Sequence, residues 1–340
     1  MAVSIRDVAK AANVSVGTVS RAFNDYKDIK EETKQLILEK ARELGYVPNL
    51  NAKILSGKKY QTLAIILVGF LADRGLTNEL VIKMLRGACL YAQDHQLEFA
   101  TYILSSEQQK EKSFEQFCNE HSLDGAICFG LKTTDVYYES LKNTKTPCVT
   151  VDVPLTGECV GYIGTDDTRA YDELTQLVLR QGHRRFVFLN GRETATVCQE
   201  RLNGLNAALS RAGLELEETF FTDFNADLAE EIVTYYLKKH GTGGATAFMC
   251  ASDFVALGAC KAIQKCGYTV GRDFAVAGFD GMDFARLSQP PIATVDQNME
   301  KKGFSAAKML YEIVNNQAKS NYCNIPYTII PGESISPCGV

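Results

Sequence analysis

The chain has 340 residues, 46% of them hydrophobic, and a formal net charge of -5. This length is two to three times the usual domain size and the composition supports a buried core, so we expect a globular protein of more than one domain and exclude a disordered or fibrous one. No apolar run approaches the roughly 20 residues that span a bilayer, and the N-terminus lacks a signal-peptide core, so we expect a cytoplasmic protein with no membrane partner.

The eleven cysteines are scattered from Cys89 to Cys338. They form no C-x-x-C pair, and no histidine cluster accompanies them. We therefore expect reduced, mostly buried thiols, no metal site and no cofactor.

Charge is distributed unevenly along the chain. Residues 1–60 contain 11 basic and 7 acidic side chains, whereas 61–340 contain 25 basic and 34 acidic ones. A basic head on an acidic body indicates that one part of the chain binds a polyanion and the other part does something else. Ordinary variation along a chain is the alternative explanation.

The first 46 residues have the apolar spacing of three short helices around one small core. Ser4 followed by Asp7 is typical of a capping box, Ser15 can cap the second helix, and Gly45 suits the end of the third. The expected helices run from Ser4 to Asn13, from Val16 to Phe23 and from Glu31 to Leu44. The expected core side chains are Val8, Ala9, Ala12, Val19, Ala22, Phe23, Leu36, Ile37, Ala41 and Leu44.

The turn before the second helix and the outer face of that helix carry small and polar residues. Gly17, Thr18, Arg21 and Asn24 share this outer face. A helix of this size fits the major groove, an arginine can contact guanine O6 and N7, and hydroxyls can bond phosphates. The pattern is typical of a helix-turn-helix, although a solvated face on an ordinary helical hairpin remains the alternative.

Tyr46-Val47-Pro48-Asn49 interrupts the helical pattern, because a proline disfavours helical angles in the residue before it. Asn49 to Leu55 can form one more helix, which is too short to be stable alone. Ser56 to Lys59 is a basic joint. We therefore expect a helix-turn-helix domain over 1–46, a hinge helix and linker over 47–60, and a body over 61–340.

From Leu63 onward, short apolar runs alternate with amphipathic helical segments such as Asn78 to Gln93. Strands that are apolar throughout and separated by helices predict parallel sheets covered on both faces. Because the pattern restarts near residue 164, we expect two doubly wound α/β subdomains with a ligand cleft between them. We assign 61–162 and 293–321 to the first subdomain, and 163–292 and 322–340 to the second. The expected strands are 63–68, 99–104, 125–129, 147–151, 185–190, 246–251 and 274–279.

The motifs also carry a resemblance to a known family. IRDVAKAANVSVGTVSRAFN and ELGYVPNLNAKIL resemble the N-terminus of the lactose/galactose-repressor (LacI/GalR) family of bacterial transcription regulators. The resemblance continues through MLRG (84–87), GHRRFVFLNG (182–191), ERLNGLNAAL (200–209), SDFVALGACKAI (252–263) and VAGFDG (276–281). It implies a body like a periplasmic sugar-binding protein and a homodimer that binds a near-palindromic double-stranded DNA operator.

For the head, the resemblance implies base contacts from Val16, Gly17 and Arg21 and a minor-groove wedge at Leu55, which agrees with the physical expectation for a short apolar hinge. Many relatives carry larger polar residues where Val16 and Gly17 stand. Lys30 replaces a frequent serine cap. The residues expected at the DNA interface are Ser4, Ser15, Val16, Gly17, Thr18, Ser20, Arg21, Asn24, Asn49, Ala52, Lys53 and Leu55.

For the body, matching the motifs places Asp152, Arg201, Asp253 and Asp280 at the cleft. Carboxylates and a guanidinium suit a saccharide, because each can hold two adjacent hydroxyls. Each also has a plain alternative: a helix-surface charge for Arg201, turn residues for Asp152 and Asp280, and a helix cap for Asp253. Phe70, Phe129 and Phe224 fall at strand ends or in loops, where they can stack on a sugar ring or simply join the core.

The sequence thus predicts a repressor whose operator affinity a small ligand controls. Two alternatives belong to other classes: a sugar-binding protein without gene control, and an enzyme on the α/β body. No G-x-S-x-G elbow, P-loop or spaced metal-ligand set is present, so we expect no catalytic residues. Residues 78–81 depart from the family pattern and are expected to alter the rim of the cleft.

Overall fold

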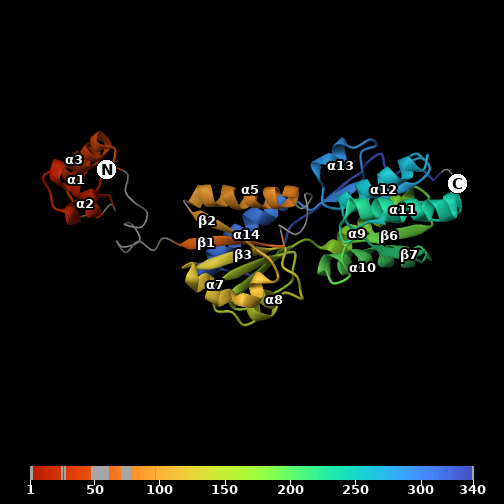
Figure 1. The fold of residues 1–340 in the computed structure, drawn as a ribbon, viewed down its shortest axis with the longest axis horizontal. Helices are drawn as coiled ribbons and strands as arrows, with labels where there is room; N and C mark the ends of the chain where they lie inside the picture. Colours follow the sequence, from red (N-terminus) through yellow and green to blue (C-terminus); the bar gives the residue numbers. More distant parts are fainter. Residues whose placement is uncertain are drawn as a thin grey trace. The chain divides into compact units, whose positions relative to one another are not determined.

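The computed structural model describes residues 3–23, 26, 28–46, 61–69, 78–95 and 97–338. The chain forms two compact units, Met1–Gln61 and Thr62–Val340. The division lies one residue from the end of the predicted linker. We describe each unit by itself (Figure 1).

The first unit contains the three predicted helices. Its core is formed by Val8, Val19 and Ile37, whose side chains are fully buried. Leu36 and Leu44 are exposed to 41% and 38%, so the prediction that they join the core is wrong. Ile37 and Ala41 are spaced to share one stripe of the third helix; Leu36 lies beside that stripe and Leu44 at the end of the helix. The helices are α1 (Ile5–Ala11), α2 (Val16–Phe23) and α3 (Glu31–Leu44).

The helix ends have the expected capping residues. The Ser4 backbone N–H and hydroxyl both donate to Asp7 Oδ2, at 2.8 and 2.7 Å. Ser15 Oγ accepts from the Thr18 N–H at 3.1 Å, which caps α2. Gly45 ends α3 at φ +67°, in the left-handed region that glycine adopts readily.

The second unit contains two α/β lobes, each built on a parallel sheet. In the first lobe the strand order is β11-β5-β4-β3-β1-β2. Leu63, Ile65 and Leu67 face a core shared with α5 and α14, whereas Ala64 and Ile66 face α7 and α8. Figure 1 shows α5 on one side of this sheet and α7 and α8 on the other. The elements are β1 (Thr62–Val68), α5 (Asn78–His95), β2 (Glu98–Leu104), α6 (Gln108–Glu111), α7 (Phe114–Glu120), β3 (Gly125–Phe129), α8 (Val136–Leu141), β4 (Cys148–Val151), β5 (Val160–Gly164), α14 (Met299–Val314) and β11 (Tyr322–Asn324).

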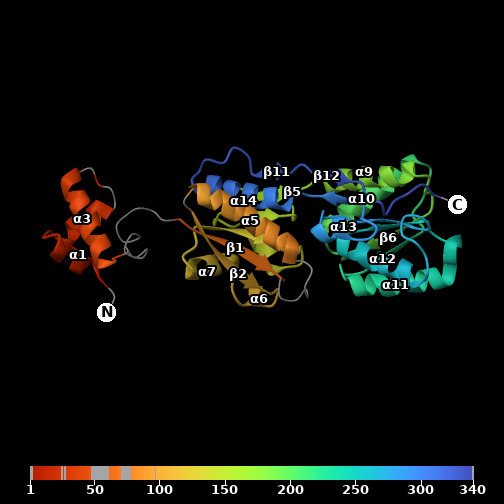
Figure 2. The ribbon, with the colours of Figure 1, turned by 90° about the horizontal axis from the view of Figure 1, so that it is seen from above.

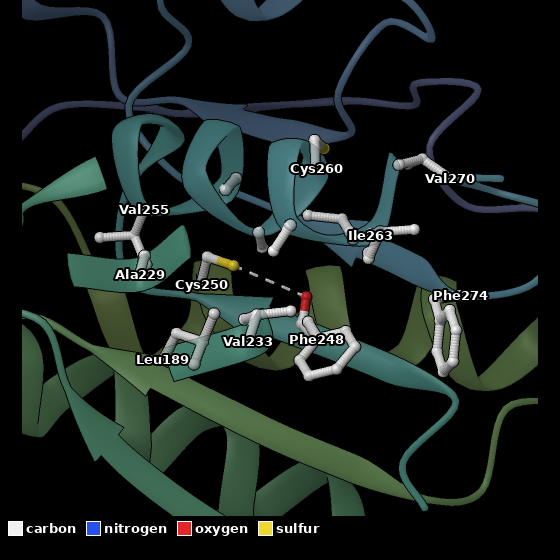
Figure 3. Close-up of a cluster of buried hydrophobic side chains, with 14 of the residues drawn as sticks. Leu189, Ala229, Val233, Phe248, Cys250, Val255, Cys260, Ile263, Val270 and Phe274 are labelled. Atoms are coloured by element: carbon white, nitrogen blue, oxygen red, sulfur yellow. Dashed lines mark hydrogen bonds between the residues drawn. The ribbon is translucent and has the colours of Figure 1, made fainter. Parts of the chain in front are cut away.

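The second lobe has the strand order β7-β6-β8-β9, again parallel. Helices α11 and α12 cover one face, and α9 and α10 cover the other. Figure 3 shows the apolar core under α12, where Cys250 and Phe248 lie among aliphatic side chains. The elements are α9 (Asp167–Arg180), β6 (Phe186–Asn190), α10 (Thr196–Arg211), β7 (Glu218–Phe221), α11 (Ala226–His240), η1 (Gly241–Gly243), β8 (Ala247–Cys250), α12 (Asp253–Lys265), β9 (Ala275–Ala277) and α13 (Asp283–Leu287).

The chain crosses between the lobes three times: after β5, before α14 and after β11 (Figure 2). The strands β10 (Thr294–Asp296) and β12 (Thr328–Ile330) pair antiparallel beside the second lobe. Two details of the structure correct the predicted boundaries between the two subdomains of the body. Residues 322–324 pair with β5 of the first sheet, and Ala293 and Val295 join the second lobe's core. Short strands at a crossing carry too little apolar pattern to show which sheet they join.

All eleven cysteines lie among the described residues and none of them forms a disulfide, and six of them are buried. Cys89 is exposed and the other four are half-buried. Among the described residues, no helix has the length and apolar character to cross a membrane. The same residues contain no group of three His, Cys, Asp or Glu side chains able to hold a metal ion.

Candidate DNA-binding and ligand-binding sites

Helix α2 and the residue that caps it expose four of the twelve predicted DNA-contacting residues on one face. Ser15, Val16, Gly17 and Arg21 are exposed, and Val16 exposes 42% of its surface although it is apolar. On the opposite face of the same helix, Val19 and Ala22 are buried in the head's core. The second helix is therefore held by one face and leaves the other for a partner.

Gly17 is not required by the packing of the head. A Cβ added there would have Ser15 Oγ at 3.7 Å and Arg21 Nη2 at 3.9 Å as its nearest neighbours, which is ordinary van der Waals contact. Glycine is also a poor helix former. Internal packing therefore does not explain why residue 17 is a glycine. Close approach of an external partner to the α2 backbone would explain it.

Arg21 forms an ion pair with Asp28, with Nη1 and Oδ2 3.0 Å apart and both side chains more than half exposed. An exposed pair of this kind contributes about 0 to 1 kcal/mol. The guanidinium is thus oriented by a weak bond that a base or phosphate can replace.

The other predicted head residues differ in their availability. Thr18 and Ser20 are half-buried, and Thr18 Oγ1 lies 2.8 Å from Ser15 Oγ. Ser4 is exposed, but its hydroxyl is engaged by Asp7, and the bonds from Ser4 lower the pKa of Asp7. Asn24, Asn49, Ala52, Lys53 and Leu55 lie outside the described residues.

In the body, the carboxyl ends of strands from both lobes meet a chain of polar side chains. Asp152 follows β4, and its Oδ1 is 2.5 Å from the ammonium of Lys302 on α14. The same ammonium donates to Gln297 Oε1 at 2.5 Å. The amide of Gln297 in turn donates to Oδ1 of Asp280 at 2.8 Å. We call these residues, with Arg201 and Asp167, the interlobe network.

Asp152 and Asp280 have positive φ angles, +59° and +121°, which are uncommon for residues with a Cβ. Their backbone N–H groups donate to Ile163 and Val295 at 2.9 Å, so neighbouring strands hold both turns in place. Strain of this kind clusters at functional sites.

Arg201 lies at the second-lobe end of the network. Its Nε donates to Asp167 Oδ1 at 2.6 Å and its Nη1 to the Ala251 carbonyl at 2.5 Å, and Nη1 is 3.8 Å from Asp280 Oδ1. The guanidinium also stacks on Phe279, 3.8 Å from the ring centroid. Because the side chain is 4% exposed, the helix-surface explanation for Arg201 is excluded.

Burial changes the protonation of the network carboxyls. It raises the pKa of Asp280 to about 7, against the lowering effect of Arg201 and with a further raising effect from Asp167. It also raises the pKa of Asp167, and that of the neighbouring Glu200 to about 7. Asp280 of the network and the neighbouring Glu200 can thus change charge near neutral pH.

Asp253 is fully buried and turned into the second lobe. It stands at the start of α12, where Oδ1 accepts from the Thr294 hydroxyl at 2.6 Å and Oδ2 from the Met282 N–H at 2.8 Å. These bonds tie α12 to β10 and to the turn after β9. They favour a structural role for Asp253 over direct ligand contact. The helix-cap alternative is wrong in detail, because the residue that caps α12 is Ser252, whose Oγ accepts from the Val255 N–H at 3.3 Å.

Two of the three predicted aromatic residues are described, and both pack against other parts of the protein. Phe129, at the end of β3, is buried in the first lobe's core. Phe224, with φ +58°, lies half-buried against Gly191, where an added Cβ would meet its ring at 2.3 Å. Phe70 lies outside the described residues.

Sequence reasoning missed three members of the network: Asp167, Gln297 and Lys302. Asp167 follows a short, glycine-containing strand, 160–164, that the pattern did not reveal. Gln297 lies at a crossing between the lobes. A lysine on an amphipathic helix is ordinarily placed on the solvent face, so no local signal marked Lys302 as buried.

Comparisons with known proteins agree with this arrangement. Residues 4–49 match the family described as bacterial regulatory proteins, lacI family, and residues 175–335 match the periplasmic binding protein-like domain. The chain is 26% identical to the HTH-type transcriptional regulator MalR of Clostridium butyricum, covering 97% of this chain and 98% of MalR. It is likewise 26% identical to catabolite control protein A of Priestia megaterium, covering 97% and 98% of the two chains.

Among solved structures, the lac repressor dimer bound to operator and the anti-inducer ONPF superposes with a TM-score of 0.85 at 21% identity, covering 99% of this chain and 100% of that one. A complex of the regulator CelR with cellobiose gives a TM-score of 0.70 at 23% identity, covering 98% and 99% of the two chains. The relatives named here are transcriptional regulators, which sets aside both the enzyme and the sugar-binding protein without gene control. The chain belongs to the LacI family of bacterial regulatory proteins and is a DNA-binding transcriptional regulator with a periplasmic-binding-protein-like ligand-binding domain.

Proposed function

We propose that this regulator is a cytoplasmic repressor that binds a near-palindromic operator as a homodimer and responds to a saccharide held between the two lobes. The domains assigned to these roles are 1–46 for DNA reading, 47–60 for the hinge, and 61–340 for ligand binding and dimerisation. The observation that carries the proposal is that one chain has both features: a head whose helix α2 exposes one face, and a body in which polar groups from both lobes converge.

For DNA reading, the support is the shape of the α2 face. Arg21 supplies the forked donor that recognises guanine, Val16 an apolar surface for a thymine methyl, and Gly17 room for close backbone approach. Ser4, Ser15, Thr18 and Ser20 have hydroxyls suited to phosphate contact.

For ligand binding, the support is chemical. Asp152 and Asp280 come from different lobes and offer carboxylate oxygens, the groups that hold sugar hydroxyls. Arg201 and Asp253 are bonded within the protein, so we assign them the task of orienting these carboxylates. CelR, a relative in fold, binds cellobiose.

The DNA proposal is tested by selecting duplexes from a random pool with the full chain, with Arg21→Ala and with Arg42→Ala. Arg42 is an exposed basic residue of α3, so its substitution removes the same charge away from α2. We expect the full chain and Arg42→Ala to enrich the same near-palindrome, and Arg21→Ala to lose the preference at one position of each half-site. Failure of the full chain to enrich any sequence would contradict the proposal.

The ligand proposal is tested by measuring affinity for the selected operator while saccharides are added one at a time. A change in affinity identifies the effector, and its direction separates an inducer from a co-repressor. Asp152→Asn should lose the response, whereas Asp94→Asn, an exposed position on α5, should keep it. An unchanged response in Asp152→Asn would remove Asp152 from the ligand site.

A further inference from the structure

Lys302 is a lysine whose side chain is completely buried. A buried ammonium is tolerated when acceptors surround it, because removing the charge from water is costly. Lys302 has two such acceptors, Asp152 Oδ1 and Gln297 Oε1, each at 2.5 Å. Its side chain therefore occupies the centre of the interlobe network.

The backbone that carries Lys302 is fixed against α5. A Cβ on Gly303 would lie 1.9 Å from the Met84 carbonyl oxygen, and one on Gly87 would lie 1.8 Å from the Glu300 carbonyl oxygen. Helices α5 and α14 therefore touch backbone to backbone on both sides of Lys302. Its ammonium cannot leave the network by a shift of α14 along α5.

The two acceptors of Lys302 lead to different lobes. Asp152 belongs to the first sheet, directly after β4. Gln297 lies at the crossing before α14, and its amide donates to Asp280 of the second lobe at 2.8 Å. The ammonium thus joins a first-lobe carboxylate to a second-lobe carboxylate through one glutamine.

We propose that Lys302 is a positioning residue that holds the two lobes together without a ligand, by taking the acceptor atoms that a ligand hydroxyl would otherwise bridge. In a two-lobed binding protein, bridging hydrogen bonds from the ligand stabilise the closed arrangement. Here the protein supplies a bridging cation of its own. A ligand then modifies an existing closure and does not create it.

The inference rests on the proposed function in one respect: the interlobe network is taken to be the ligand site. The test of this inference needs neither ligand nor DNA, so the inference and the proposed function can fail separately. The reporter is a second contact between the lobes, in which the Asp283 N–H of α13 donates to Glu79 Oε1 of α5 at 2.9 Å. If the lobes separate, this amide becomes exposed to solvent.

The experiment compares the full chain with Lys302→Met, which keeps an unbranched side chain one atom shorter and removes the charge. Lys301→Met is the matched control, because Lys301 is the exposed neighbour on the same helix. Two quantities are measured without ligand: the exchange rate of the Asp283 amide, and the distance between labels on noncanonical amino acids at the exposed positions Glu139 and Glu193. Labels of this kind avoid the native cysteines.

We expect Lys302→Met to raise the exchange rate by about tenfold to a hundredfold, the effect of losing a hydrogen bond to a charged group. The label distances should become longer and more widely distributed. Lys301→Met should match the unmodified protein in both measurements. A merely structural role for Lys302 would lower the unfolding temperature while leaving the label distance unchanged.

Asp152→Asn gives a second route to the same answer if Lys302→Met does not fold. It removes the charge partner at the edge of the network, where the Asp152 side chain is 18% exposed. We expect the same opening, to a smaller extent. If the folded variants of both residues keep the exchange rate and label distance of the unmodified protein, the proposal is overturned.

Discussion

Gly303 of α14 packs directly on the Met84 carbonyl of α5, and the residue before it, Lys302, is the buried ammonium of the interlobe network. The distance that an added Cβ would have, 1.9 Å, is far below any van der Waals contact. A feature of backbone packing thus sets the position of a charged group.

Gly303→Ala should therefore destabilise the body by about 3 kcal/mol or more, because relief of the clash requires α14 to separate from α5. Urea unfolding followed by circular dichroism measures the change. Gly243→Ala is the control, since an added Cβ there meets nothing within 4 Å. Equal stability of the two variants would show that α14 shifts without cost.

Arg201→Met should cost about 3 to 5 kcal/mol of unfolding free energy, because it leaves Asp167 buried without its cation. Arg169→Met on α9 should change stability by less than about 1 kcal/mol, since its pair with Glu173 is exposed. Denaturant titration of both variants provides the comparison. A small effect of Arg201→Met would mean that Asp167 takes up a proton when the arginine is absent. In that case the variant should lose stability at a higher pH than the unmodified protein as the pH is raised.

Gly17→Ala should leave the head at least as stable, with a gain of up to about 1 kcal/mol, because alanine is the better helix former and the added methyl meets no clash. Operator affinity should nevertheless fall, since the methyl group separates the α2 backbone from the bases. Gln35→Ala, at an exposed position of α3, serves as the control. Thermal unfolding and operator titration of the same samples separate the two effects; unchanged affinity would exclude close approach at Gly17.

Asp280 makes stability depend on pH in a defined direction. Burial raises its pKa to about 7, well above the ordinary value for an aspartate, so the folded state holds the proton more tightly than the unfolded chain does. The stabilisation of the folded state that Asp280 contributes is present below about pH 4 and is lost as the pH rises through about 7.

In Asp280→Asn the carboxyl is replaced by a group that does not titrate. The free energy of unfolding should fall less between pH 5 and pH 7.5 in this variant than in the unmodified protein, and Glu200 accounts for part of the decline that remains. Urea titrations at four pH values across this interval measure the slope. Identical slopes would show that Asp280 is ionised throughout the range.

The sequence was most informative where pattern and capping agree. Helices α2 and α3 have the predicted bounds, because Ser15 and Gly45 mark a start and an end that local chemistry requires. The first sheet was recognised from apolar runs such as 125–129, which is buried at every position.

The interlobe network was harder to predict, because its members are joined by tertiary structure alone. Asp152 and Lys302 are 150 residues apart in the chain and meet through a partly buried hydrogen bond. No period or local motif connects them. The prediction found the carboxylates through a family resemblance, and it missed the lysine because burial of a charge depends on a partner that the local sequence does not show.

The threefold crossing also imposes an order on how the protein can be made. Helix α14 and strand β11 complete the first lobe, yet they follow the entire second lobe in the chain. A ribosome that has finished β5 must add roughly 160 more residues, which takes about 8 to 30 s at usual elongation rates, before β11 is available. Until α14 has been synthesised, the face of the first sheet that it covers lacks Met299, Leu310 and Ile313, three of its buried side chains. The nascent first lobe therefore exposes apolar surface for the whole time that the second lobe is being synthesised, and we expect it to be prone to aggregation during that interval.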